Sequence, residues 1–221
     1  MADARKLAAA ALLRVEADGG YSNIVLNSAL NSSEISHADR ALASALFYGV
    51  LDRRITIDWL LSKHIKTPLK KVAPYTLTVL RCAVYQIAFM EKIPESAAVN
   101  EAVKLIKASG ERRNAAFVNA VVRNIIRTGT DLPYGNDVRT LSVRYSCPEW
   151  IVKSFINDYG EENTVELLSQ SLKTPPVTVR VNTVRTTPER LIKILEENNV
   201  KAAGTETENA LTISITGDIT A

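Results

Sequence analysis

The chain has 221 residues, of which 46% are hydrophobic and 23% are charged, a composition typical of a folded globular protein. No stretch approaches the roughly 20 apolar residues of a membrane helix. Arg14 and Glu16 interrupt the apolar part of the N-terminal segment, so the segment does not fit the pattern of a signal peptide. The two cysteines are 65 positions apart and predict no disulfide framework, which favours a cytoplasmic location. His37 and His64 have no Cys or His partner at metal-ligand spacing, so we predict no metal site.

The net charge of +3 conceals an uneven distribution along the chain. Residues 1–130 contain 18 Lys and Arg against 11 Asp and Glu, a net charge of +7. Residues 131–221 contain 9 against 13, a net charge of −4. A basic half is typical of a nucleic-acid-binding domain, although basic helical surfaces also occur without any partner.

The first 130 residues predict consecutive helices with short connections. Asp3, Ser22 and Ser36 are placed to cap the first three helices. The segment 74–90 is apolar almost all round, which predicts a central helix enclosed by the others.

Two further helices are predicted in "PESAAVNEAVKLIKASG" and "ERRNAAFVNAVVRNIIRTG" (94–129). Their apolar residues recur at helical spacing, and polar and basic residues occupy the opposite side of each helix. These residues are Asn100, Lys104, Lys107, Arg112, Asn119, Arg123 and Arg127.

The turn-rich segment "TDLPYGND" (130–137) predicts a domain boundary between a helical domain, residues 1–130, and a connecting region, residues 131–221. In the connecting region, a helical stretch over 137–172 precedes a small α+β unit over 175–221. "VTVRVNTV" alternates with period two, Pro188 opens a helix, and two more strands follow, which gives the order β-α-β-β. The sequence therefore predicts a mainly α protein, in which an all-α bundle precedes a small helical plus α+β segment.

The segment "RYSCPEW" (144–150) contains a candidate nucleophile, Cys147. Ser146 and Glu149 predict a capping box that places Cys147 at the first helical position, where a helix N-terminus favours a thiolate. However, Glu149 opposes a second negative charge, Pro148 supplies no N–H, and no nearby histidine is available as a base. We interpret Cys147 as a residue at a helix start and predict no catalytic residue.

Three short motifs occur in order: Leu80 to Tyr85, Val99 to Val103 and Phe117 to Val121. Together they resemble the C-terminal helices of the NusB family. "RYSCPEW" and "RVNT" (180–183) resemble the region that joins a NusB-like domain to the catalytic domain in the Sun (RsmB) family of ribosomal RNA cytosine-C5 methyltransferases.

The resemblance implies an enzyme that transfers a methyl group from S-adenosylmethionine to C5 of a cytosine in 16S rRNA, with two catalytic cysteines, one following a proline. This sequence has no glycine-rich cofactor fingerprint and no Pro-Cys dipeptide, and it stops at "ITGDITA" (215–221), about where a linker would begin. We therefore expect an N-terminal, non-catalytic portion that positions rRNA, holds no cofactor or metal of its own and is inactive alone.

We expect nine residues to contact RNA. The Arg and Lys side chains suit phosphates, and the amide suits a base edge or a sugar. The nine residues are Arg5, Lys6, Lys104, Lys107, Arg112, Arg113, Asn119, Arg123 and Arg127. Four of these cations have an alternative explanation, because the helix dipole stabilises positive charge in the last turn of a helix. These four are Lys104, Lys107, Arg123 and Arg127.

Other polar residues of the motifs suggest different roles. We interpret Arg81 and Asn100 as buried structural groups, and we expect Arg180 and Asn182 to share one strand face toward RNA or the catalytic domain. The competing function is a NusB-like module of transcription antitermination that binds a ribosomal protein. A third possibility is a scaffold without a partner.

Overall fold

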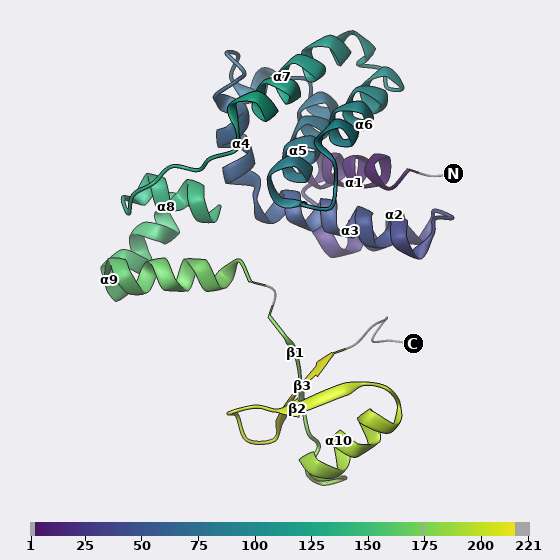
Figure 1. Ribbon diagram of the computed structural model, residues 1–221, viewed down its shortest axis with the longest axis vertical. Coiled ribbons are helices and arrows are strands. Elements are labelled where there is room, and N and C mark those ends of the chain that lie inside the picture. Colours follow the sequence, from purple (N-terminus) through teal and green to yellow (C-terminus); the bar gives the residue numbers. More distant parts are fainter. Residues whose placement is uncertain (1–2, 174, 215–221) are drawn as a thin grey trace. The chain divides into compact units, whose positions relative to one another are not determined.

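The structure is a computed structural model and describes residues 3–173 and 175–214 (Figure 1). The chain divides into two compact units, Met1–Ser169 and Gln170–Ala221. The helices of the first unit are α1 (Ala4–Asp18), α2 (Ser22–Asn31), α3 (His37–Asp52), α4 (Arg54–Ser62), α5 (Pro74–Phe89), α6 (Glu95–Lys107), α7 (Ala115–Thr128), α8 (Val138–Tyr145) and α9 (Glu149–Ser171), which extends just past the division. Two short 3₁₀ turns are η1 (Leu69–Lys71) and η2 (Arg112–Asn114).

Two of the three predicted helix caps are present. Asp3 accepts a hydrogen bond from the Arg5 backbone N–H at 2.9 Å, and Ser36 Oγ accepts one from the Asp39 N–H at 3.1 Å. The prediction for Ser22 is wrong, because Tyr21 occupies the capping position without a side-chain bond and Ser22 is already helical.

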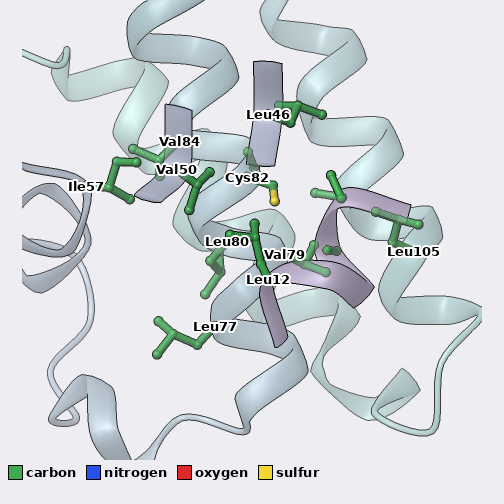
Figure 2. Packing of buried hydrophobic residues seen from close by; sticks show 14 of the residues in the cluster. Leu12, Leu46, Val50, Ile57, Leu77, Val79, Leu80, Cys82, Val84 and Leu105 are labelled. Atoms are coloured by element: carbon green, nitrogen blue, oxygen red, sulfur yellow. The ribbon is translucent and has the colours of Figure 1, made fainter. Parts of the chain in front are cut away.

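The central helix is α5, as the apolar segment predicts. Pro74 opens it, where a fixed φ suits the first turn. Apolar side chains of α5 share one core with Leu12 of α1, Leu46 of α3, Ile57 of α4 and Leu105 of α6 (Figure 2). This arrangement confirms that the first unit is a helical bundle organised around an enclosed helix.

Arg81 is buried within this bundle, as the sequence interpretation expects. Its Nε and NH2 groups donate to the two carboxylate oxygens of Asp58 on α4 at 2.7 and 2.8 Å. Its NH1 group donates to Glu16 of α1. Burial is the largest influence and lowers the pKa of the guanidinium, but the bonds to Asp58 and the charges of Asp58 and Glu16 together raise it. Arg81 therefore joins α1, α4 and α5 through paired charges.

The first unit extends beyond the non-helical connection at 130–137, because α8 packs against α4. Thr56 Oγ1 donates to the Val143 carbonyl at 2.6 Å, and Ser146 Oγ accepts from the Ile55 N–H at 3.1 Å. The domain boundary at residue 130 stays a prediction. The capping box is wrong: Ser146 has a left-handed backbone with φ 53° and ends α8, and α9 begins only at Glu149.

The second unit contains a three-stranded antiparallel sheet in the order β1-β3-β2. Its elements are β1 (Val177–Arg180), α10 (Pro188–Glu197), β2 (Lys201–Gly204) and β3 (Ala210–Ser214). Val177 pairs with Ile213, and Val179 pairs with Leu211, so these apolar residues share one face. The mainly α class with a terminal β-α-β-β unit is thus confirmed, whereas the expected linker at 215–221 lies outside the described residues.

The first strand is shorter than predicted. Asn182 Oδ1 accepts a hydrogen bond from the Val184 N–H at 3.2 Å, and the Asn182 carbonyl accepts from the Arg185 N–H at 3.0 Å. These bonds form a turn after Arg180. Asn182 therefore does not share a strand face with Arg180, which corrects that expectation.

Candidate nucleic-acid interface

The helices α6 and α7 pack against each other (Figure 1). Their apolar faces enter the core. Val99, Ile106, Val118 and Ile125 are all buried. Because a helix repeats every 3.6 residues, the polar positions between these apolar ones lie on the outer side of the pair.

Two hollows follow the junction of α6 and α7. One is lined by Asn100, Val103, Lys104, Lys107, Ala108 and Asn119. The other is lined by Glu95, Ser96, Val99, Asn100, Arg123, Ile126 and Arg127. Asn100 lines both hollows, so the two adjoin. We call the polar residues Asn100, Lys104, Lys107, Asn119, Arg123 and Arg127 the α6–α7 surface.

Asn100 is exposed at the centre of this surface. The interpretation of Asn100 as a buried structural group is therefore wrong. Its position on α6, opposite the buried Ala98 and Ala102, turns the amide outward, where it has both a donor and an acceptor to offer a ligand.

Two cations of the α6–α7 surface, Lys104 and Arg123, have only weak or local partners. Lys104 Nζ lies 3.4 Å from Glu101 Oε2, and the lysine side chain is 71% exposed, so this ion pair contributes at most about 1 kcal/mol. Arg123 Nε donates to Asn119 Oδ1 at 3.1 Å. The helix dipole favours cations in the last turn of a helix, and the last turns of α6 and α7 contain Lys104, Lys107 and Arg127. Arg123 lies one turn earlier, so the dipole does not explain its position.

Arg112 and Arg113 are exposed on η2, between α6 and α7. This turn is anchored to the start of α5, because Glu111 Oε2 accepts from the Thr76 N–H at 2.8 Å and Asn114 Nδ2 donates to Thr76 Oγ1 at 2.9 Å. The two guanidinium groups are thus carried by an ordered turn and remain accessible.

Arg5 and Lys6 lie apart from these residues. Arg5 Nε donates to Gln86 Oε1 at 2.7 Å, so part of its hydrogen-bonding capacity is used within the protein. Lys6 lines a separate hollow between α1 and α2, together with Asp3, Ser32 and Ser33. The structure therefore brings five of the nine predicted contacts onto the α6–α7 surface, places Arg112 and Arg113 on the adjoining turn and leaves Arg5 and Lys6 elsewhere.

Sequence reasoning missed a third hollow beside the first two, which includes His64, Phe117, Asn124 and again Arg127. The spacing of Phe117 and Asn124, seven residues apart, places both on one side of α7 and was an available signal. His64 follows α4 and gave no such signal, because only the tertiary fold brings it to α7.

The connection between β1 and α10 lacks the features of a nucleotide-cofactor loop. The connection from β1 to α10, residues 181–187, contains no glycine, and the strands pair antiparallel, unlike the glycine-rich turns of parallel sheets that bind nucleotide cofactors. Burial raises the pKa of the Cys147 thiol, which disfavours a thiolate nucleophile. Within ranges 3–173 and 175–214, no three His, Cys, Asp or Glu residues are grouped to hold a metal, and no helix is long and apolar enough to cross a bilayer.

Comparison with known proteins gives two domain matches in succession. Residues 2–127 match the NusB family, and residues 147–220 match the Methyltr_RsmF/B-like, ferredoxin-like domain. A Bacillus subtilis (strain 168) protein, "Probable ribosomal RNA small subunit methyltransferase B", is 36% identical over 92% of this chain and 45% of its own length. The chain thus spans about half the length of that relative.

Solved structures share the fold. "Crystal Structure of PH0851" aligns over the whole chain and 50% of its own, with a TM-score of 0.66 and 17% identity. "Crystal Structure of Antitermination Factors NusB and NusE in complex with dsRNA" covers 57% of this chain and 95% of its own, with a TM-score of 0.53 and 20% identity. The chain therefore belongs to the NusB family and carries, after its NusB domain, an RsmF/B-type ferredoxin-like domain.

Proposed function

We propose that residues 1–221 bind small-subunit rRNA and position it for a methyltransferase domain outside these residues. The observation that carries the proposal is the succession of a NusB match and an RsmF/B-type ferredoxin-like match, aligned over 92% of this chain with a relative named as an rRNA methyltransferase. In the proposal, the complete protein transfers a methyl group from S-adenosylmethionine to C5 of a cytosine in 16S rRNA, in the cytoplasm.

The α6–α7 surface and η2 supply the chemistry for holding RNA. Arg and Lys side chains neutralise phosphates, and the amides of the exposed Asn100 and the half-buried Asn119 suit base edges or ribose hydroxyls. The buried side of each helix fixes these groups relative to one another. No methyl-transfer step is assigned to residues of this chain.

Fluorescence anisotropy of a labelled small-subunit rRNA fragment, measured at several salt concentrations, tests the proposal. The test variant reverses three charges, Arg112→Glu, Arg113→Glu and Arg123→Glu. The slope of log K against log salt is negative, and each lost phosphate contact reduces its magnitude by about 0.7 for single-stranded RNA, so we expect the magnitude to fall by about 2 in total.

A second triple variant controls for net charge. Lys66→Glu, Lys70→Glu and Lys71→Glu also change the charge by six units, at exposed lysines between α4 and α5. We expect this control to keep the wild-type slope apart from a small general effect of charge. An unchanged slope in the arginine variant, or an equal fall in both variants, contradicts the assigned surface.

A protein-binding module is the second candidate function. Tyr21 and Ile24, at the start of α2, are 80% and 61% exposed, and a protein partner can cover such apolar side chains. A related solved structure contains NusE beside NusB and RNA. If the wild-type chain binds no rRNA fragment but binds a NusE-type protein, and Tyr21→Ser weakens that binding, the second candidate replaces the first.

A further inference from the structure

A line of hydrogen bonds runs from His64, which follows α4, to the α6–α7 surface. The His64 Nδ1 atom lies 3.0 Å from Asn124 Nδ2, and its Nε2 atom lies 3.3 Å from Thr128 Oγ1. On the other side of the amide, Arg127 NH2 donates to Asn124 Oδ1 at 2.6 Å. Arg127 is exposed and lines two adjoining hollows.

The direction of these bonds fixes the proton on the imidazole. An amide nitrogen only donates, so Nδ1 of His64 accepts and carries no proton. The neutral ring then carries its proton on Nε2 and donates to Thr128 Oγ1, whose own hydroxyl donates to the Asn124 carbonyl at 3.0 Å. Each donor thus meets an acceptor when His64 is neutral and the amide oxygen of Asn124 faces Arg127.

The charges around His64 favour the same state. Lys63 beside it and Arg127 on α7 are both cationic, and no salt bridge joins His64 to a carboxylate in ranges 3–173 and 175–214. Burial, followed by the charges of Lys63 and Arg127, lowers the pKa of His64 below its ordinary value. These influences all favour the neutral imidazole over the charged one.

We propose that His64 is a positioning residue that, through Asn124, holds the Arg127 guanidinium in place to receive an RNA phosphate. This inference rests on the proposed function, since it assigns a role within the same surface. Without His64, the Asn124 amide can take either orientation. Nδ1 of a neutral His64 accepts a hydrogen bond only from the amide nitrogen of Asn124, which keeps the amide oxygen toward Arg127. Fixing a long side chain before binding lowers the entropic cost of the contact.

Protonation of His64 releases Arg127. A proton on Nδ1 faces the amide nitrogen of Asn124, so the amide must rotate to offer its oxygen to the ring. Its nitrogen then faces the Arg127 guanidinium, and two donors cannot bond. The arrangement is complete above the ordinary histidine pKa of about 6.5 and is lost as pH falls through the lower value in the folded protein.

Nitrogen-15 NMR of the RNA-free protein tests the hydrogen-bond line itself. We expect the Nε2–H tautomer of His64 at pH 8 and a shared titration midpoint for the His64 ring, the Asn124 amide and the Arg127 guanidinium. His64→Gln, which keeps an acceptor but does not titrate, should abolish the pH dependence of Asn124 and Arg127, whereas His37→Gln, at an exposed histidine, should leave it. An Nδ1–H tautomer, or Arg127 signals that ignore the titration of His64, overturns the inference.

RNA anisotropy at pH 7.5 then tests the consequence for binding. We expect Asn124→Ala to weaken the wild-type complex about two- to tenfold and to have no effect in the Arg127→Ala background. An equal loss in both backgrounds overturns the positioning role. If the wild type binds no RNA, the proposed function fails, and the NMR result still shows whether His64 controls Arg127.

Asn124→Asp provides a second variant that retains the size of the side chain. Its carboxylate accepts a hydrogen bond from protonated Nδ1 and also pairs with Arg127, so we expect the pKa of His64 to rise above the wild-type value. An unchanged pKa contradicts the contact between residues 64 and 124.

Discussion

Replacing Arg81 by methionine should destabilise the first unit by about 3 kcal/mol. The guanidinium side chain is only 8% exposed and donates to carboxylates of two other helices, Asp58 on α4 and Glu16 on α1. Methionine retains much of the apolar stem but removes every donor, so the substitution isolates the charged contacts.

The expected magnitude follows from the burial of the three groups. Three charge-assisted hydrogen bonds have a gross worth of roughly 5–9 kcal/mol. The Glu16 and Asp58 side chains are 25% and 28% exposed, so water reaches both carboxylates after the substitution and reduces the loss. Arg54 is the matched control: it lies 3.6 Å from the same Glu16 but is 53% exposed, so Arg54→Met should cost at most about 1 kcal/mol.

Urea unfolding followed by tryptophan fluorescence measures both losses. The two tryptophans, Trp59 and Trp150, belong to the first unit, so the signal reports its unfolding. The effect of Arg81→Met should also shrink in an Asp58→Asn background, because the two residues share their bonds. A loss below about 1 kcal/mol, or equal losses for Arg81→Met and Arg54→Met, refutes the assignment of Arg81 as a buried link between helices.

Two further predictions concern the same unit. A Cβ atom on Gly49 would lie 2.0 Å from Tyr85 Cζ, so Gly49→Ala should shift the ring and cost about 1–3 kcal/mol in urea unfolding, and an unchanged stability would contradict this close approach of α3 and α5. Burial raises the pKa of Cys82 to about 12 and also raises that of the half-buried Cys147. A raised pKa leaves less thiolate at pH 8, so a disulfide reagent should label Cys147 slowly and Cys82 only on unfolding; rapid labelling of native Cys82 would contradict its burial.

Local patterns were sufficient to predict most helices and the β-α-β-β order. The segment that forms α5 is apolar almost all round, and only a helix enclosed by others can bury such a surface. The outward position of Lys104 and Lys107 likewise followed from the helical period of their apolar neighbours. These features depend on residues close in sequence, for which periodicity is a direct physical signal.

The errors arose where a polar side chain had a distant or competing partner. Ser146 fits a capping box locally, but its oxygen accepts a hydrogen bond from the Ile55 N–H, 91 positions away. Asn182 fits an alternating strand, but its amide bonds the following backbone and turns the chain. The pairing of His64 with Asn124 spans 60 positions and has no signature in either segment.

The two sides of α7 allow binding and folding to be tested separately. Val118, Val122 and Ile125 are fully buried, so α7 is held by its apolar side, whereas Arg123 is exposed and donates to Asn119 on its own helix. A surface substitution away from packed contacts usually changes stability by less than about 0.5 kcal/mol. If the Arg123→Glu variant loses RNA binding while its urea unfolding is unchanged, the loss therefore reflects a missing contact between Arg123 and RNA. By contrast, Asn124 joins α7 to His64 in the turn after α4, and its variants require the stability measurement before any change in affinity is interpreted.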